Sequence, residues 1–258
     1  MQPLMRLPII IMVWIVLMSK YSKILLAVLV LLLVSIKLQA RIYVVSVGVA
    51  DYPGAKYDLR LPGNDAATME WLYKENKQAV VKLLRNGNAT VSNIQSVMRN
   101  LYAKAAPDDI VVLYFSGHGV KGAFCCYDGL LTYSDIVGIM SAGHCRNMMV
   151  FADACYSGAM RKKYDVGRKQ TTSGNNVMFF LACRSNEFSI EKSTMTNGLF
   201  THALQHGLRG AADKNRNRVI TAKELYQYVS TKVKQTSGNR QHPVMWGRFS
   251  DAMPVMKW

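Results

Sequence analysis

The chain is predicted to fold as one α/β domain on a mostly parallel sheet of about six strands, with helices on both faces. From residue 41 onward, short runs rich in β-branched residues alternate with amphipathic stretches, which is typical of parallel strands joined by helical crossovers. That part of the chain contains no repeat and no second apolar core, and its length suits a single α/β domain.

Each element follows from its own stretch of sequence. The expected strands cover residues 42–49, 80–84, 110–116, 148–152, 177–183 and 244–249. The expected helices cover residues 64–76, 90–104, 198–207 and 224–234, the second of them with Thr90 as its N-cap. The polar stretch 161–176 is expected to be a surface loop.

Composition limits the class of protein. The 258 residues include 32 Lys and Arg against 16 Asp and Glu, a net charge of +16, and 50% of them are hydrophobic. These values exclude a disordered chain, a disulfide-stapled miniprotein and a polytopic membrane protein. Because the basic residues form no long run, they indicate a solvated basic surface, and no nucleic-acid partner is predicted.

The N-terminal residues 1–40 are predicted to be a signal peptide or a membrane anchor. Two apolar runs, 7–18 and 24–34, flank a segment that contains Lys20 and Lys23, and each run is short of the ~20 residues that span a bilayer. The second run ends near Ala40, a small residue suited to signal cleavage. Residues 41–258 would then be periplasmic or secreted. Alternatively, residues 7–36 anchor the domain to a membrane. Met18 is a second candidate start, which would make residues 1–17 an extension of the gene model.

The cysteines do not predict a metal site. Their number, five, is odd, so at least one thiol is free, and no CxxC pair is present. Cys125, Cys126, His144 and Cys145 lack the spacing of zinc ligands. No cofactor is therefore predicted.

Two strands end in glycine-flanked motifs that carry reactive side chains. The third strand runs into Ser-Gly-His-Gly at 116–119, and the fourth into Asp-Ala-Cys-Tyr-Ser-Gly at 153–158. Ligands of open α/β sheets bind at the carboxyl ends of the strands, where a cysteine in a tight turn is exposed and reactive. Taken alone, His118 is most simply interpreted as a loop histidine, and Cys155 as a small buried side chain. Because both lie at the ends of neighbouring strands, the two together indicate a catalytic site.

These motifs, with Leu-Pro-Gly-Asn-Asp-Ala at 61–66, resemble the caspase-like cysteine peptidases, and most closely the bacterial metacaspase or orthocaspase branch. The stretches NGLFTHAL and QHPVMWG also resemble bacterial caspase-family proteins. The resemblance covers nearly all of residues 41–258. It implies a three-layer caspase-like fold and a peptidase domain over those residues.

The resemblance also implies roles for the reactive residues. Cys155 would be the nucleophile, forming a thioester acyl-enzyme, and His118 would be the acid and base. The backbone N–H groups of Gly119 and Cys155 would form the oxyanion hole. No third member of a triad is evident in the sequence.

The same resemblance implies an acidic S1 pocket made by Asp65, Ser116 and Asp153. Such a pocket binds a basic side chain, so the substrates would be peptides or proteins cut after Arg and, more slowly, Lys. Two other interpretations remain: Asp65 caps the helix that starts near it, and Asp153 only orients the cysteine turn.

Some positions depart from the family pattern. Tyr156 replaces the histidine usual after the nucleophile, and Pro62 stands where a cysteine is common. By the resemblance, Asp128 and Asp135 could belong to the family's cluster of calcium-binding acids, but Lys162 stands where another acid is expected. Activation by calcium is therefore not expected.

Residues 213–224 match an EF-hand loop in part. Arg218 replaces the glycine that this loop needs, and Lys214, Arg216 and Arg218 oppose the binding of a divalent ion. The preferred interpretation is a capping box, formed by Thr221 and Glu224, that opens the last helix.

The leading hypothesis is an exported cysteine endopeptidase that cuts after basic residues. The alternative is a catalytically idle caspase-fold module that binds a peptide or an envelope partner. A third option is a transferase or ligase that uses the same thioester.

Overall fold

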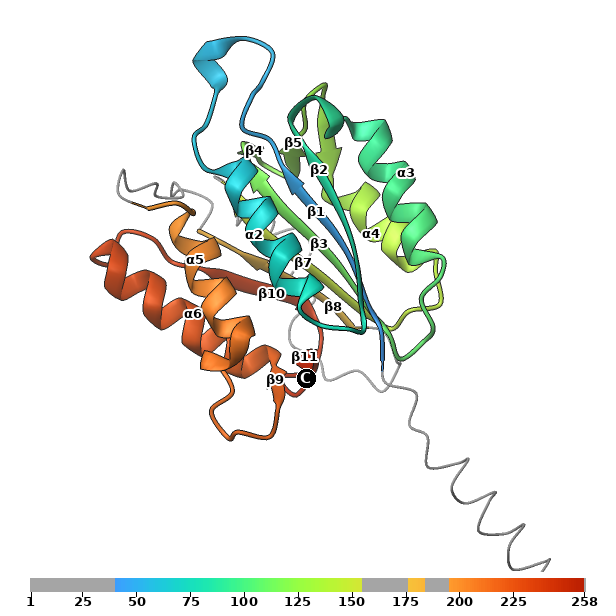
Figure 1. Ribbon diagram of the computed structural model, residues 1–258, viewed down its shortest axis with the longest axis vertical. Helices are drawn as coiled ribbons and strands as arrows, with labels where there is room; N and C mark the ends of the chain where they lie inside the picture. Colours follow the sequence, from blue (N-terminus) through green and yellow to red (C-terminus); the bar gives the residue numbers. More distant parts are fainter. Residues whose placement is uncertain (1–39, 155–175, 184–194, 258) are drawn as a thin grey trace, which may run out of the picture. The chain divides into compact units, whose positions relative to one another are not determined.

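A six-stranded sheet forms the centre of the structure, a computed structural model that describes residues 40–154, 176–183 and 195–257 (Figure 1). The strands lie in the order β10-β8-β7-β3-β1-β2, and all are parallel except β10, which is antiparallel to β8. Their bounds are β1 Ile42–Gly48, β2 Ala79–Arg85, β3 Ile110–Gly117, β7 Asn147–Ala154, β8 Asn176–Leu181 and β10 Val244–Arg248. The predicted mostly parallel α/β sheet is confirmed.

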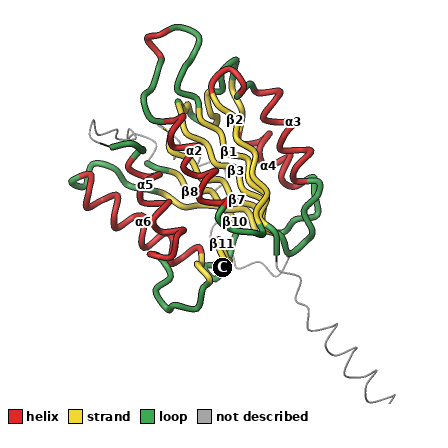
Figure 2. The backbone as a smooth tube through the Cα atoms, in the orientation of Figure 1, coloured by secondary structure: helices red, strands yellow, loops and turns green. Residues whose placement is uncertain are grey.

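Helices cover both faces of this sheet (Figure 2). One face carries α2 (Pro62–Lys74), α5 (Leu199–His206) and α6 (Ala222–Ser237); the other carries α3 (Val91–Tyr102) and α4 (Tyr133–Ser141). Alternate residues of each strand enter the two cores, as in β1, where Val44 packs toward α2 and Val45 toward α3. The expected three layers are therefore present.

The sequence predicted the long elements better than the short ones. All six expected strands and all four expected helices are present within a few residues of their bounds, and Thr90 caps α3 by accepting the N–H of Asn93. No element was predicted between residues 119 and 141. That stretch forms β4 (Gly119–Val120), β5 (Ala123–Cys125), β6 (Leu130–Thr132) and α4. Strands of two or three residues are too short to show a period-2 pattern.

Two small antiparallel sheets complete the fold. β4, β5 and β6 form one of them, directly after β3. β9 (Val219–Thr221) pairs with β11 (Pro254–Lys257) in the other. A short 3-10 turn lies at Ala55–Tyr57, another at Asn86–Asn88, and a π-helical turn follows α5 at Gly207–Ala211. Among residues 40–257 as described, no helix is long and apolar enough to span a membrane.

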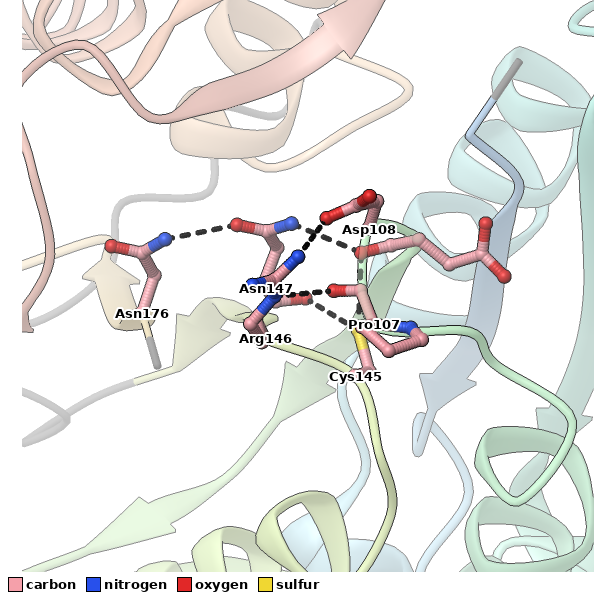
Figure 3. A network of polar contacts seen from close by, with 7 residues as sticks. Pro107, Asp108, Cys145, Arg146, Asn147 and Asn176 are labelled. Carbon is pink, nitrogen blue, oxygen red and sulfur yellow. Dashed lines mark hydrogen bonds and ion pairs between the residues drawn. The ribbon is translucent and has the colours of Figure 1, made fainter. Parts of the chain in front are cut away.

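A polar network joins the amino ends of the central strands, at the sheet edge opposite the reactive motifs (Figure 3). Arg146 pairs with Asp108, and the amide of Asn176 donates to the Asn147 side chain at 2.9 Å. The Cys145 thiol donates to the Asp109 carbonyl oxygen at 3.1 Å. Cys145 therefore contributes to the local structure at this edge of the sheet.

Two buried tyrosines differ in whether the hydroxyl group is hydrogen-bonded, and this difference allows a matched test of stability. The Tyr73 hydroxyl, on α2, has no hydrogen-bond partner among the described residues, whereas the Tyr102 hydroxyl, on α3, donates to the Val112 carbonyl at 2.7 Å. An unpaired buried hydroxyl is destabilising and a paired one is stabilising. Tyr73→Phe should therefore raise the free energy of unfolding by about 1 kcal/mol, and Tyr102→Phe should lower it by about 1 kcal/mol. Urea unfolding of the two variants measures this, and equal losses in both would contradict it.

Candidate active site

The reactive motifs lie at the carboxyl edge of the sheet, where adjacent parallel strands hold them in register. Ser116 of β3 is the partner of Asp153 of β7, and Gly117 is the partner of Ala154. His118 and Cys155 are the residues that follow this last pair in the two chain segments. Cys155 lies outside the described residues, so the structure places His118 and the predicted pocket residues but not the nucleophile.

His118 is half-buried and is fixed through its ring. Its Nε2 atom lies 2.8 Å from the carbonyl oxygen of Tyr57, in the loop between β1 and α2. Because a carbonyl oxygen only accepts hydrogen bonds, Nε2 carries the proton in this contact and Nδ1 is left for proton exchange. A backbone carbonyl therefore orients the histidine, which is the role that a triad's third side chain has elsewhere.

Tyr52 holds the backbone of the same loop. Its hydroxyl accepts the N–H of His118 at 2.8 Å and donates to the carbonyl of Cys125 at 3.0 Å. The Cys125 N–H in turn donates to the His118 carbonyl at 2.9 Å. The Tyr52 hydroxyl thus links His118 to Cys125, the pair of residues next to the paired strands β4 and β5. A Cβ at Gly117 would lie 2.7 Å from this hydroxyl, so glycine makes room for it.

Gly119, a predicted oxyanion-hole donor, is buried at the start of β4, opposite Phe124 of β5. In antiparallel ladders, hydrogen-bonded pairs alternate with pairs that share no hydrogen bond. Because His118 and Cys125 form a hydrogen-bonded rung, the ladder directs the N–H of Gly119 away from β5. That orientation suits a donor to a bound ligand.

Asp65, in the first turn of α2, is almost completely buried. Its Oδ2 atom accepts the Ser116 hydroxyl at 2.8 Å. Its Oδ1 atom accepts the side-chain amide of Asn197 at 3.0 Å and the N–H of Gly198 at 2.9 Å. The structure therefore brings Asp65 and Ser116 together, as predicted, and adds the residues just before α5.

Asp153, at the end of β7, is also buried and lies against the start of α5. Its Oδ2 atom accepts the N–H and the hydroxyl of Thr201, at 3.0 and 2.8 Å. A Cβ at Gly198 would lie 2.3 Å from the same oxygen and 3.2 Å from Asp65 Oδ2. Only glycine allows the helix start to approach both carboxylates this closely.

The two carboxylates influence each other electrostatically. Burial, and secondly the charge of Asp153, raise the pKa of Asp65 to about 7, although the hydrogen bonds from Asn197, Ser116 and Gly198 act in the opposite direction. Among the described residues, no Lys or Arg side chain forms an ion pair with Asp65. A cation placed beside it would favour its ionised form.

The idea that Asp65 caps α2 is wrong. The N-cap of this helix is Leu61, and no side chain caps it. Asp65 turns away from its own helix and accepts the N–H of Gly198, the N-cap residue of α5. Pro62, which departs from the family pattern, occupies the first turn of α2, where proline is well tolerated.

The acids considered for calcium have local partners. Asp128 accepts the N–H of Val91, at the start of α3, and Asp135 accepts the Thr132 hydroxyl at the start of α4. Within the described ranges, no three His, Cys, Asp or Glu residues are grouped to hold a metal ion. The capping box of Thr221 and Glu224 at the start of α6 is confirmed.

Sequence reasoning missed several contributors to this site. Tyr52 and the Tyr57 carbonyl support His118, while Asn197 and Thr201 support the carboxylates. One signal was present, because the NGLFT stretch at 197–201 covers the start of the helix predicted at 198–207, and helix starts bind anions through their free N–H groups. A surface pocket of about 300 Å³ lies between residues 211–214 and α6, and another of about 250 Å³ lies between α5 and α6; neither is lined by these residues.

Comparisons with known proteins agree with this architecture. A family model described as a caspase domain matches residues 41–252. Among solved structures, the chain is similar to protein GSU0716 from Geobacter sulfurreducens, with a TM-score of 0.62 and 18% sequence identity. That match covers 84% of this chain and 99% of the other, and at this identity it supports the fold alone. A search of curated proteins finds no match.

The raised pKa of Asp65 gives a test by stability. At a pH below 3.8, the ordinary pKa of an aspartate, the Asp65 carboxyl is protonated in both the folded and the unfolded protein, so its burial does not desolvate a charge. From pH 3.8 to about 7 the unfolded state has released this proton while the folded state keeps it, so stability falls over this range and is fully lost once the folded state also ionises above about 7. The free energy of unfolding of Asp65→Asn, relative to that of wild type, should therefore increase by a few kcal/mol as the pH is raised from 4 to 8. Thermal unfolding across that range measures the difference, and a difference independent of pH would contradict the assignment.

Proposed function

The chain belongs to the caspase-domain family, which supports a cysteine-peptidase type of function, and we propose that it is an exported endopeptidase that cuts peptide bonds after Arg and, more slowly, Lys. The observation that carries the specificity is the pair of buried carboxylates, Asp65 and Asp153, at the sheet edge beside His118.

The proposed chemistry uses Cys155 and His118. The Cys155 thiolate attacks the scissile carbonyl carbon, and His118 gives a proton to the leaving amine as the C–N bond breaks, which leaves a thioester. His118 then takes a proton from the water that hydrolyses the thioester. The contact with the Tyr57 carbonyl supports this role, because it fixes the ring and leaves Nδ1 to carry the exchanged proton. The mechanism draws only on groups of the chain and has no step that uses calcium.

Negative charge develops on the substrate oxygen during the attack. The N–H groups of Gly119 and Cys155 are the proposed donors to that oxygen. The alternation of the β4–β5 ladder supports this role for Gly119, since its N–H points away from β5. Tyr52 supports it indirectly, because its hydroxyl holds the adjacent His118 N–H.

Asp65, Ser116 and Asp153 are the proposed S1 residues. Two buried carboxylates close enough to raise a pKa favour a cation and disfavour an acidic side chain. A guanidinium offers several donors in a planar fork, whereas an ammonium is one compact charge, so Arg should bind better than Lys. Ser116, bonded to Asp65, supplies a further polar contact at the same place.

Export is supported by the signal-like residues 1–40 and by the surroundings of Arg41. The backbone N–H of Arg41 donates to Asp109 Oδ1 at 2.8 Å, and Asp109 is buried. Cleavage after Ala40 would turn this amide into an ammonium beside a carboxylate, a stronger, charge-assisted contact. A new N-terminus at Arg41 would therefore fit the fold. An uncleaved anchor formed by residues 7–36 is the other form of export.

The specificity is tested with a series of matched fluorogenic peptides. Arg at P1 should be cleaved fastest, Lys more slowly and Asp not measurably. Citrulline is the uncharged counterpart of Arg. Because ionisation of the catalytic thiol changes kcat/KM equally for both substrates, the ratio of the two values reports only the effect of the positive charge at P1. The ratio of kcat/KM for Arg to that for citrulline should rise with pH as Asp65 ionises. Asp65→Asn should lower the ratio at least ~10-fold and abolish its pH dependence.

Asp251→Asn, which removes a carboxylate from an exposed turn, is the control and should leave the ratio unchanged. Efficient cleavage after Asp, or an Asp65→Asn protein with the wild-type ratio, would contradict the acidic pocket even if the protein proved to be a peptidase.

The export proposal is tested by intact mass. When the full chain is expressed in a bacterium, the mature protein should begin at Arg41 in the periplasmic or secreted fraction. A species that keeps residues 24–40 and stays in washed membranes would contradict signal cleavage and favour the anchor.

A further inference from the structure

A chain of buried hydroxyl groups ends on one of the two pocket carboxylates. Tyr114 of β3 and Thr201 of α5 are both fully buried, and their hydroxyl oxygens are 2.5 Å apart. The Thr201 hydroxyl lies 2.8 Å from Asp153 Oδ2. The chain therefore joins the centre of the sheet, the first turn of α5 and the end of β7.

The direction of these hydrogen bonds follows from the number of protons. Each hydroxyl has one hydrogen to donate, and Thr201 donates its hydrogen to Asp153. Tyr114 must then donate to Thr201. Burial, with the nearby charges of Asp65 and Asp153, raises the pKa of Tyr114 well above its usual value, so its hydroxyl keeps its proton. Both hydroxyls thus point their hydrogens toward the carboxylate.

Such a chain favours the ionised form of the acid at its end. A hydroxyl that receives a hydrogen bond is a stronger donor to the next group, and donors to a carboxylate stabilise its charged form. The backbone N–H of Thr201 adds another donor to the same oxygen, at 3.0 Å. An apolar side chain in place of either hydroxyl would interrupt the chain while the helix start remained.

We propose that Tyr114 and Thr201 are positioning residues that keep Asp153 ionised and fixed in orientation, and that they thereby set the preference for a cationic over a neutral substrate side chain. The proposal rests on the proposed function, because it takes Asp153 as part of the pocket for a basic side chain. Neither residue needs to touch the substrate for this role.

Among the described residues, three elements place titratable groups near Asp153. Asp65 faces it from α2 and Tyr114 from β3. Cys183, just after β8, donates to the carbonyl of Ala154, the residue next to Asp153. The first turn of α5, at residues 199–201, contributes no titratable side chain. Between pH 4 and pH 8, Asp65 and Asp153 are the groups whose charge this proposal concerns.

The first experiment measures stability and does not depend on activity. Thr201→Val and Tyr114→Phe remove one hydroxyl each with little change of shape, and Tyr102→Phe removes a buried hydroxyl that bonds a backbone carbonyl on the opposite face of the sheet. Urea unfolding of each variant is compared with wild type at pH 4 and pH 8. Thr201→Val and Tyr114→Phe should lose clearly more stability at pH 8, where Asp153 must be charged, than at pH 4. The Tyr102→Phe loss should be the same at both pH values.

The second experiment measures specificity with the Arg and citrulline substrates. Thr201→Val should lower the Arg-to-citrulline ratio of kcat/KM about tenfold, through KM for Arg, as expected for one lost hydrogen bond to a charged group. Tyr114→Phe should lower the ratio less. Thr201→Ser, which restores the hydroxyl, should return the ratio close to wild type, and Tyr102→Phe should leave it unchanged.

The outcomes separate this proposal from the proposed function. Stability losses in Thr201→Val and Tyr114→Phe that are equal at pH 4 and pH 8 would overturn the proposal, whatever the substrate preference. Wild-type protein that cleaves Arg and citrulline substrates equally would overturn the basic specificity, and with it the specificity role of the chain. In that case the pH-dependent stability would still decide whether the hydroxyls hold the charge of Asp153.

Discussion

The parallel register between β3 and β7 is the constraint on which the rest of the site depends. It sets Ser116 opposite Asp153 and Gly117 opposite Ala154, so the two reactive motifs leave the sheet at one level. A shift of one residue would turn one of the pocket side chains to the other face of the sheet. At the opposite edge, the N–H of Arg146 donates to the Pro107 carbonyl and the side-chain amide of Asn147 donates to the Asp109 carbonyl. These contacts tie the start of β7 to the start of β3 and support this register.

The buried carboxylates of Asp65 and Asp153 meet the start of α5. A buried pair of acids costs stability unless donors surround it. The start of α5 supplies such donors to both acids through Gly198 and Thr201, and glycine at position 198 permits the close approach. A structural role alone does not require two like charges at this place. Two carboxylates there suit the binding of a cation, which connects the electrostatics of the site to the proposed specificity.

Much of the fold was predictable because its long elements carry clear sequence patterns. The continuous apolar, β-branched run of β1 and the capped, amphipathic helix α3 needed no tertiary information. The short strands β4 to β6 did, since two or three residues show no pattern. In the site, the motifs were enough to bring Asp65, Ser116 and Asp153 together. The support of His118 was not predictable, because it comes from the backbone carbonyl of Tyr57, which any residue type would supply.

The hydrogen-bonded hydroxyl groups of Tyr114 and Thr201 could not be predicted from the sequence for a related reason. Tyr114 lies inside a strand that reads as ordinary buried core, and Thr201 lies within a helix, so neither stands in a motif with a stated role. Their alignment arises only when β3, β7 and α5 are packed together.

The central claim is that Cys155 is a nucleophile served by a pocket for a basic side chain. Its most direct test is to treat the folded protein with an arginine-bearing electrophile and its citrulline counterpart, and to map the modified cysteine by mass spectrometry. We expect rapid modification of Cys155 by the arginine reagent only, with Cys125, Cys126, Cys145 and Cys183 as internal controls. Equal modification by both reagents, or modification of another cysteine in preference to Cys155, would contradict it.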